Sequence, residues 1–143
     1  MNENIKIKGD LLIQLTRDGK IIDEREVKNV ITTTGVNLVA TLVSGLGTAF
    51  THMGIGTGTT AASASDTALE TQTGRVTLTS KAVTGGTIAY IGDFPAGTGT
   101  GSITEAGNFN ASSAGTMLNR AVFSAVNKTA ADALKITWNV TFA

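Results

Sequence analysis

Few side chains in this sequence could do chemistry, and His52 is the first to consider because it is the only histidine. A Ser-His-Asp triad uses its histidine as a base, which is held by an acid and placed beside a nucleophile. His52 lies in the stretch Thr51-His52-Met53-Gly54, which has the character of a strand, so we expect a packed or surface side chain. A zinc site needs several nitrogen or sulfur ligands. With one histidine and no cysteine, neither a zinc site nor a disulfide is expected.

The run Gly54-Ile55-Gly56-Thr57-Gly58 has some of the glycine spacing of a dinucleotide-binding fingerprint. The true motif follows a strand, opens a helix and lies within a βαβ unit. Here a loop of threonine, alanine and serine follows, and no alternation of strands and helices is visible. We therefore interpret these glycines as positions that allow tight backbone turns, and we expect no cofactor.

The acidic residues beyond the N-terminal region are too scattered for a glycosidase pair or a calcium loop. They are Asp66, Glu70, Asp93, Glu105 and Asp132. Four charged residues nevertheless lie inside apolar or neutral stretches: Glu70, Glu105, Arg75 and Arg120. A charge buried in an antiparallel sheet needs a partner. One hypothesis is that at least one Glu–Arg pair among these four is a structural ion pair, and the alternative is four solvated charges.

The composition favours a protein that works within an assembly. Of the 143 residues, 41% are hydrophobic and 15% are charged, and the net charge is zero. A typical soluble domain has about 25% charged residues. Nucleic-acid binding normally needs a concentrated positive surface, which a balanced chain does not predict. Low charge also gives little protection against association.

No segment is expected to enter a membrane or direct secretion. The start of the chain lacks the apolar core of a signal peptide, and no run approaches the roughly 18 apolar residues of a membrane span. We therefore expect synthesis and folding in a cytoplasm.

Alternating apolar residues between positions 5 and 15 predict a first strand. The sequence Arg17-Asp18-Gly19-Lys20 predicts a tight hairpin turn, and a return strand then covers about residues 20–31. Of the 11 basic and 11 acidic residues, twelve lie within residues 3–28. One face of this hairpin must therefore be exposed to solvent or contact a charged partner.

One short helix is expected, over about residues 35–44. Thr33 or Thr34 can cap its start, and Gly45 lies where it would stop. A single helical turn, capped by Asp66, is a further expectation over residues 66–70.

Strands separated by glycine-rich turns dominate the rest of the chain, which indicates a sandwich or barrel. We place them at about residues 51–56, 74–83, 87–94, 102–110, 117–127 and 134–143. The last strand has the clearest alternation, and we expect it in the middle of a sheet. The predicted fold is an all-β, antiparallel, jelly-roll-like sandwich of about eight strands, with one helix near residues 35–44. It forms a single domain over residues 1–143, with the hairpin of about residues 4–31 as a possible contact arm.

Two stretches of this sequence resemble a family of proteins. The first runs from Met53 to Thr60, with Ala-Ser-Ala-Ser-Asp-Thr-Ala-Leu-Glu-Thr and Arg75-Val76 after it. The second comprises residues 103–110, 117–123 and 128–132. Together they are similar to small virion proteins of tailed bacteriophages, found as capsid cement (decoration) proteins and as modules of tail or fibre proteins. The likeness covers roughly residues 50–143, and Asn108 departs from it where an apolar residue is more usual, which suggests a slightly more polar surface.

The resemblance implies a structural role in the virion. The partners would be the major capsid protein and copies of the chain itself, commonly as a homotrimer where capsomers meet. A mechanical function needs no enzyme activity, cofactor, small-molecule substrate, nucleic acid or membrane. Assembly would take place in the bacterial host cytoplasm.

Either the extreme N-terminus or the charged part of the hairpin is the candidate contact with the capsid, and the hairpin part is considered because it holds most of the charge that could set register. The hairpin part comprises Asp18, Lys20, Asp23, Glu24, Arg25, Glu26 and Lys28. The alternative is a solvated sheet edge that its charges protect from aggregation. A tail, baseplate or fibre-attachment subunit is the rival function within virions. A glycan- or receptor-binding module is a third possibility, and a hydrolase is the least favoured.

Overall fold

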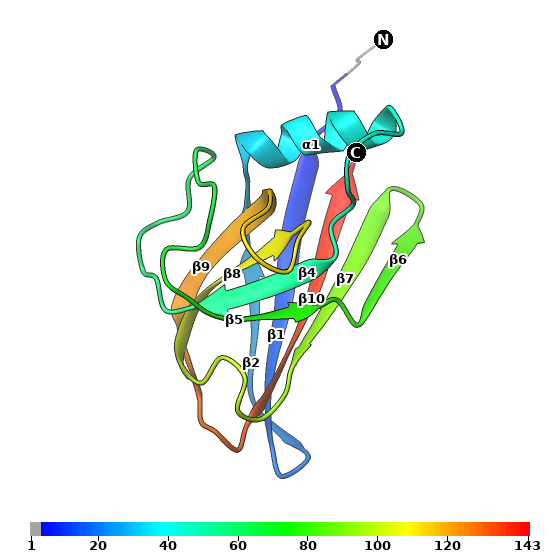
Figure 1. Cartoon of the computed structure of the whole chain (residues 1–143). Helices are drawn as coiled ribbons and strands as arrows, with labels where there is room; N and C mark the ends of the chain where they lie inside the picture. The colour runs from blue at the N-terminus through cyan, green and yellow to red at the C-terminus, as the bar shows by residue number, and fades with distance from the viewer. Residues whose placement is uncertain (1–3) are drawn as a thin grey trace.

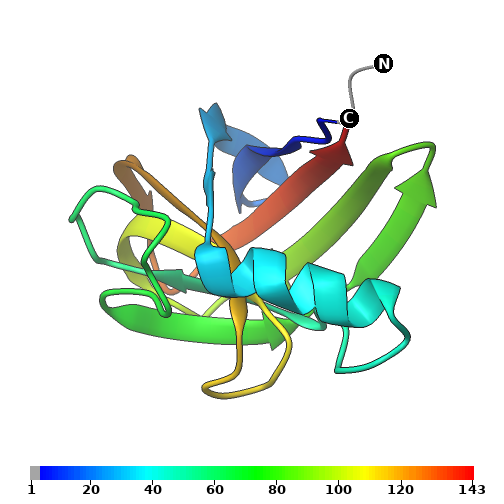
Figure 2. The ribbon, with the colours of Figure 1, turned by 90° about the horizontal axis from the view of Figure 1, so that it is seen from above.

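The computed structural model describes residues 4–143, and it places ten strands in two packed sheets with one helix across one end (Figures 1 and 2). The elements are β1 (Ile7–Arg17), β2 (Lys20–Lys28), β3 (Val30–Ile31), α1 (Thr33–Val43), β4 (His52–Gly56), β5 (Gln72–Thr77), β6 (Ser80–Thr84), β7 (Thr87–Phe94), β8 (Gly101–Phe109), β9 (Met117–Lys128) and β10 (Ala133–Phe142). The first sheet has the order β2-β1-β10-β7-β6 and the second β3-β9-β8-β4-β5. Every strand pairing is antiparallel.

This architecture confirms the predicted all-β antiparallel sandwich with one short helix. Four consecutive pairs lie side by side within one sheet, namely β1–β2, β4–β5, β6–β7 and β8–β9. In a jelly roll most successive strands alternate between the two sheets. The likeness to a jelly roll is therefore limited to the two-layer sandwich.

The two strands beyond the predicted eight come from two predicted strands that divide. The region 20–31 becomes β2 and β3, and the region 74–83 becomes β5 and β6. In both cases the chain crosses from one sheet to the other at the division. At the second crossing, the N–H of Leu78 donates to Thr51 beside β4, and the N–H of the next residue, Thr79, donates to Ile91 in β7.

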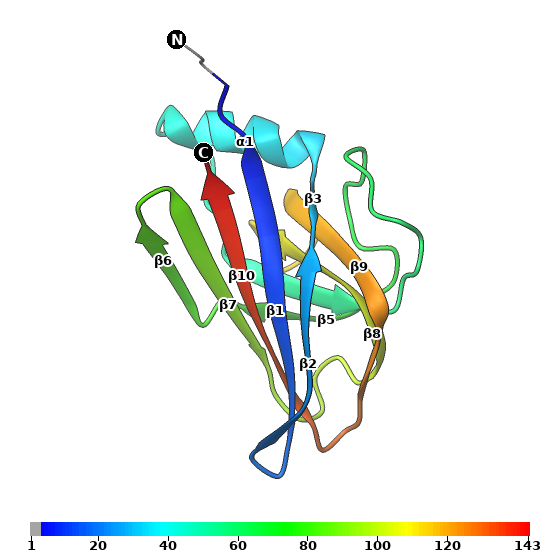
Figure 3. The same ribbon diagram turned by 180° about the vertical axis from the view of Figure 1, so that it is seen from behind.

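The predicted hairpin and the predicted central strand are both present. Asp18 and Gly19 have φ values of 52° and 75°, which are the left-handed conformations that tight hairpin turns require. β10 lies between β1 and β7 in the middle of the first sheet (Figure 3). Its Trp138 side chain is fully buried between the two sheets. The alternation of apolar residues in the sequence therefore correctly predicts which face of β10 points into the core.

The helix begins two residues earlier than predicted, and its cap is Thr32 rather than Thr33 or Thr34. The Thr32 hydroxyl accepts a hydrogen bond from the N–H of Gly35 at 2.9 Å. Thr32 also donates to the carbonyl of Met117 in β9 and has extended backbone angles, so it joins the helix start to the second sheet. The helix stops before Gly45, as expected, with φ of 78° there.

The helical turn predicted at residues 66–70 is absent. This stretch has no helical hydrogen bonding, and Asp66 instead accepts the N–H of Ser63, three residues before it. Leu69 is buried against Phe109 and Met117, on the outer side of the second sheet. Its burial holds this stretch against β8 and β9 as an extended loop.

Candidate interaction surfaces

Of the two predicted capsid contacts, the extreme N-terminus (residues 1–3) lies outside the described residues. The hairpin segment presents only part of its charge to solvent. Five of its seven side chains are exposed, at the turn and on β2: Asp18, Lys20, Glu24, Glu26 and Lys28. We call these five residues the hairpin charges. They carry both signs, so they can pair with a charged partner surface.

The other two residues of the segment, Asp23 and Arg25, are half-buried and have a structural role. Arg25 donates to both carboxylate oxygens of Asp23, at 3.2 and 3.0 Å. The same guanidinium donates to the main-chain carbonyls of Ser124 and Ala125 in β9. Arg25 therefore joins the edge of the first sheet to the second sheet and is not available to a partner.

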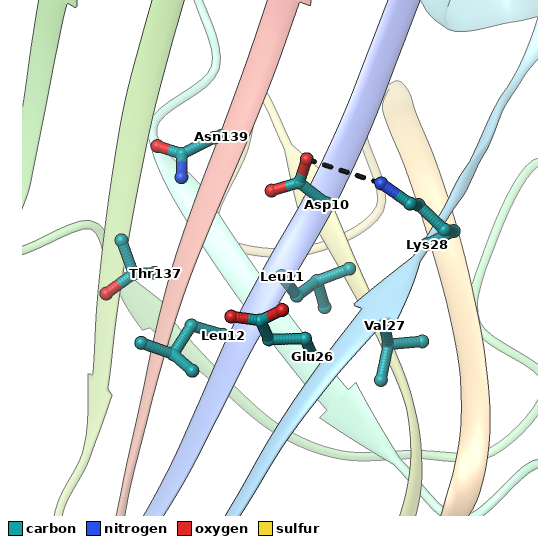
Figure 4. A pocket seen from close by; sticks show the side chains of 8 residues that line it. All are labelled: Asp10, Leu11, Leu12, Glu26, Val27, Lys28, Thr137 and Asn139. Carbon is teal, nitrogen blue, oxygen red and sulfur yellow. Dashed lines mark ion pairs between the residues drawn. The ribbon is translucent and has the colours of Figure 1, made fainter.

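A shallow hollow of about 420 Å³ lies on the outer face of the first sheet beside these charges (Figure 4). Its lining residues are Asp10, Leu11, Leu12, Glu26, Val27, Lys28, Thr137 and Asn139. Lys28 Nζ lies 3.7 Å from Asp10 Oδ2, and both side chains are more than half exposed. A pair in this setting contributes little to stability, because water screens both charges. The hollow could accept a polar side chain from another protein.

The helix at the opposite end of the molecule, together with the loop after it, contains no charged residue. No Asp, Glu, Lys or Arg occurs between Lys28 and Asp66, a stretch that contains α1 and the loop after it. We call residues 33–50 the helix end (Figure 2). Three large apolar side chains are exposed there: Val36 at 44%, Val43 at 84% and Leu46 at 65%. None of its own side chains is charged, although the Lys81 ammonium of β6 contacts it at the main-chain carbonyl of Phe50.

An apolar groove of about 410 Å³ adjoins the helix end, between α1 and the first sheet. It is lined by Val39, Leu42, Val43, Phe50, Ile88, Tyr90, Leu118 and Phe142. Burial raises the pKa of Tyr90 to about 12, so its hydroxyl is neutral at physiological pH. The groove extends the apolar surface of the helix end towards β7.

Two of the four residues considered for ion pairs, Glu105 and Arg120, are brought together by the neighbouring strands β8 and β9. Arg120 Nε donates to Glu105 Oε2 at 2.9 Å, and Nη2 lies 2.9 Å from the same oxygen. Arg120 Nη1 donates to Asp66 at 3.0 Å. The exposed fractions of the Glu105 and Arg120 side chains are 0% and 2%, so this is a buried pair.

The same carboxylate fixes both ends of the loop between β4 and β5. Glu105 Oε1 accepts the N–H groups of Gly58, at 3.1 Å, and Thr71, at 2.7 Å. Oε2 accepts the N–H of Glu70 at 2.9 Å. Glu105 therefore anchors both ends of the long loop of residues 57–71 to the outer face of the second sheet, in addition to the packing of Leu69.

The glycines at 54, 56 and 58 do not form a turn, contrary to the interpretation from sequence. Gly54 and Gly56 lie within strand β4, and none of the three has a positive φ. Glycine is needed at both Gly56 and Gly58 because the 57–71 loop and the Glu105 carboxylate lie against their main chain. A Cβ atom would lie 2.2 Å from the Thr71 carbonyl oxygen at Gly56 and 2.5 Å from Glu70 Cβ at Gly58. A Cβ atom at either position would lie 2.6 Å from Glu105 Oε1. Sequence spacing alone carried no sign of this close approach.

The remaining two residues of the proposed ion-pair set, Glu70 and Arg75, do not pair with each other in the described structure. Glu70 accepts hydrogen bonds from the hydroxyl and N–H of Thr60, and these lower its pKa. Arg75 lies 3.6 Å from the ring centroid of Phe109, and burial lowers its pKa. Both residues hold loops in place.

Asn108 is fully buried and not at the surface, which corrects the expectation from the resemblance. Its side-chain amide donates to Asn119 Oδ1 at 3.0 Å, and Asn119 donates to Asn29 Oδ1 at 3.3 Å. Trp138 Nε1 donates to the same Asn29 oxygen at 2.6 Å. The core thus contains a chain of amides that the sequence analysis did not foresee.

A second ionic cluster closes the end of the molecule opposite to α1. The fully buried Asp132 accepts from Arg17 Nε at 2.7 Å and Nη2 at 2.9 Å, and from the N–H of Thr129 at 2.8 Å. The hydrogen bonds from Arg17 and Thr129 hold the pKa of Asp132 well below its usual range. The buried Lys128 donates to the carbonyls of Pro95 and Asp132. These contacts join the β1–β2 hairpin, the β9–β10 turn and the exit of β7.

His52 lies on β4 without an acidic hydrogen-bond partner among the described residues. Its ring nitrogens contact the hydroxyls of Thr51, at 2.8 Å, and Thr77, at 3.3 Å. Within residues 4–143, no group of three or more His, Asp or Glu side chains could hold a metal ion. No helix in this part of the chain is long and apolar enough to cross a membrane.

Comparison with known proteins identifies no relative of this chain. No protein-family model, no curated protein and no solved structure matches this chain.

Proposed function

We propose that this chain is a non-enzymatic structural protein of a tailed-phage virion, of the capsid decoration type. It binds the major capsid protein and copies of itself and stabilises the expanded head lattice. The proposal is supported by the resemblance of residues 50–143 to phage virion proteins. On the structural side, it is carried by the helix end, an uncharged surface with three exposed apolar side chains.

The helix end has the properties of the centre of a protein–protein interface. Interface cores are depleted in charged residues, and the helix end combines an uncharged sequence with three exposed large apolar side chains. The capsid partner would be an uncharged, apolar surface, because any charge facing Val43 or Leu46 would be desolvated without a counterion. The hairpin charges, at the β1–β2 turn and along the exposed side of β2, are then free to meet a neighbouring subunit and set register.

The aromatic side chains weigh against a glycan-binding function. The chain has five Phe, one Tyr and one Trp, and none of these seven is exposed. Sugar sites commonly present exposed aromatic rings, whose apolar faces contact the sugar. Here the aromatic rings form the core and the floor of the apolar groove.

The test is binding of the purified protein to expanded, empty phage heads that lack tails, measured by co-sedimentation and quantitative gel densitometry. Because cement proteins occupy a repeated lattice, we expect saturation at hundreds of copies per head. Binding of a handful of copies, or binding to tails alone, would instead support a tail, baseplate or fibre-attachment subunit. A saturable response to host polysaccharide, with no binding to heads, would support the glycan-binding alternative.

A further inference from the structure

The apolar groove beside the helix end continues into a second hollow of about 380 Å³. The two share four lining residues, namely Leu42, Phe50, Ile88 and Tyr90, and the second hollow adds Ala49, Lys81 and Val83. We call the two together the extended groove. One of its walls is formed by β7 and β6, which lie side by side at the outer edge of the first sheet (Figures 1 and 3).

Two polar side chains, Tyr90 and Lys81, line the extended groove, and every other lining side chain is apolar. Tyr90 and Lys81 lie directly opposite each other on β7 and β6. In an antiparallel pair, opposite residues have Cβ atoms about 4.5–5.5 Å apart and lie on the same face of the sheet. One ligand group can therefore contact both side chains.

The Tyr90 hydroxyl is a hydrogen-bond donor without a protein partner. Tyr90 is 4% exposed, and no residue of the described range 4–143 forms a hydrogen bond with its hydroxyl. A buried tyrosine hydroxyl usually has such a partner. The Tyr90 oxygen is not among the fully enclosed unpaired atoms of the described structure, so it is accessible from the groove that Tyr90 lines.

Lys81 supplies a positive charge that no carboxylate of the described residues neutralises. Its Nζ donates to the carbonyl of Phe50 at 3.1 Å. An ammonium group has three donors, so two remain for a ligand. The extended groove thus combines an apolar wall with a cation and a hydroxyl donor at one end, which is complementary to an anion that carries an apolar chain.

From this we infer that the extended groove binds a single-chain aliphatic carboxylate. The carboxylate would accept hydrogen bonds from Lys81 and Tyr90, and the chain would lie along the apolar residues towards Leu118 and Phe142. A peptide segment fits less well, because its main-chain N–H and C=O groups would be buried against apolar side chains without partners. The inference concerns the free protein and does not depend on the proposed function.

The test is isothermal titration calorimetry with monomeric dodecanoate, below its critical micelle concentration. Dodecyltrimethylammonium has the same chain with a positive head group, and the protein should bind dodecanoate at least tenfold more tightly. Octanoate should bind at least tenfold more weakly than dodecanoate, because a fully buried methylene contributes up to about fourfold in affinity and octanoate lacks four of them.

Three variants test the two polar residues. Lys81→Met keeps the aliphatic stem, removes the charge and should weaken dodecanoate binding by about tenfold or more. Tyr90→Phe removes only the hydroxyl and should weaken it by about threefold or more. Lys135→Met is the matched control, because Lys135 is an exposed lysine on the opposite face of the same sheet, and dodecanoate binding should be unchanged.

Several outcomes would overturn the inference. They are no binding of dodecanoate up to millimolar concentration, equal affinity for the cationic amphiphile, and equal effects of Lys81→Met and Lys135→Met. Binding to anionic lipid vesicles without binding to monomeric dodecanoate would also overturn it, since it would indicate a contact with a membrane surface.

Circular dichroism checks that each variant is folded. We expect Tyr90→Phe to fold because the hydroxyl has no protein partner, and if it does not, the head-group comparison and Lys81→Met still decide the question. Failure of head binding would leave these calorimetric results unaffected, so the two proposals can fail separately.

Discussion

At the scale of single residues, Glu105 has the most contacts to explain. Its two oxygens accept three main-chain N–H groups and the Arg120 guanidinium in a site without solvent exposure. Ion pairs of this kind are not automatically stabilising, because the desolvation of both charges offsets their attraction. Their loss is costly all the same, since the remaining partner stays buried and unpaired.

We therefore expect Glu105→Gln to lower the free energy of unfolding by about 3 kcal/mol or more, measured by urea titration at pH 7. The glutamine amide would present N–H groups to donors that now point at a carboxylate oxygen. Glu26→Gln is the matched control, because Glu26 is exposed, and its effect should be within about 0.5 kcal/mol. Equal effects of the two substitutions would show that the buried pair does not hold the 57–71 loop.

Gly9 provides a second prediction at this scale. A Cβ atom there would lie 1.9 Å from Asn29 Oδ1, the oxygen that accepts the Trp138 indole N–H. Gly9→Ala should displace Asn29, leave a buried donor unsatisfied and cost about 1–3 kcal/mol. Because Trp138 is the only tryptophan, its fluorescence emission should report the change directly.

A double-mutant cycle tests whether Asn29 is the cause. Asn29→Ala removes the group with which the new methyl would clash, so Gly9→Ala should cost little more in that background. Additive losses in the double variant would mean that the strain at Gly9 arises elsewhere.

At the scale of elements, Asp132 joins three segments that are distant in sequence. The folded state holds the pKa of this carboxyl below its usual value, so ionised Asp132 stabilises the fold. This contribution is fully present above the ordinary aspartate pKa of about 3.9, and it is lost as the pH falls below that value towards the lower folded pKa. Acid should therefore loosen the contacts among the hairpin, the β9–β10 turn and the exit of β7.

Asp132→Asn should lower the melting temperature at pH 7 and reduce the further loss of stability between pH 5 and pH 2, since the titrating group is gone. Thermal unfolding followed by circular dichroism at several pH values measures both effects. Asp18→Asn is the control, because Asp18 is exposed and asparagine also tolerates its turn conformation. An unchanged acid dependence in Asp132→Asn would contradict the assignment of this carboxylate.

Some features of the strands can be predicted from the sequence, and others cannot. Strands with a clear alternation, such as β1 and β10, have the inner faces that the sequence predicts, because a period of two reports burial directly. The crossings after β2 and after β5 were missed, since neither Asn29 nor Leu78-Thr79 includes the glycine or proline that usually marks a break. A crossing between sheets changes the hydrogen-bond partners without requiring an unusual backbone conformation.

Sites made by residues far apart in the chain were only partly accessible from sequence. The hypothesis of a Glu–Arg pair followed from charges inside apolar stretches, but nothing in the spacing could select Glu105 and Arg120 from the four residues considered. The glycines that admit Glu105 lie about fifty residues before it in the chain, and their role depends on the pairing of β4 with β8. The helix end was missed although the uncharged stretch is visible in the sequence, because exposure is a property of the folded chain.

At the scale of the whole molecule, the two ends differ in charge. Exposed apolar side chains occur at both ends, since Ile21 and Ile22 on β2 are 54% and 48% exposed, but only the hairpin end combines them with exposed charged residues. The helix end carries Val36, Val43 and Leu46, and the far end carries the β1–β2 turn with its charges. Two ends of such different character imply two kinds of contact, which respond differently to salt. Apolar contacts are insensitive to salt or strengthened by it, whereas contacts between exposed charges weaken as ionic strength rises.

If the helix end is the principal contact with the capsid, Val43→Lys should weaken binding to expanded heads by about tenfold or more, because a lysine there would have to be desolvated. Val43 is 84% exposed, so the fold should tolerate the substitution. The matched comparison is Glu24→Lys/Glu26→Lys, which reverses charge among the hairpin charges and should have a smaller effect. Co-sedimentation at low and high salt measures both variants, and wild-type binding should persist at high salt. The opposite result is binding that is lost at high salt and in the charge-reversed variant but is retained by Val43→Lys. It would mean that the hairpin contacts the capsid and the helix end contacts another subunit.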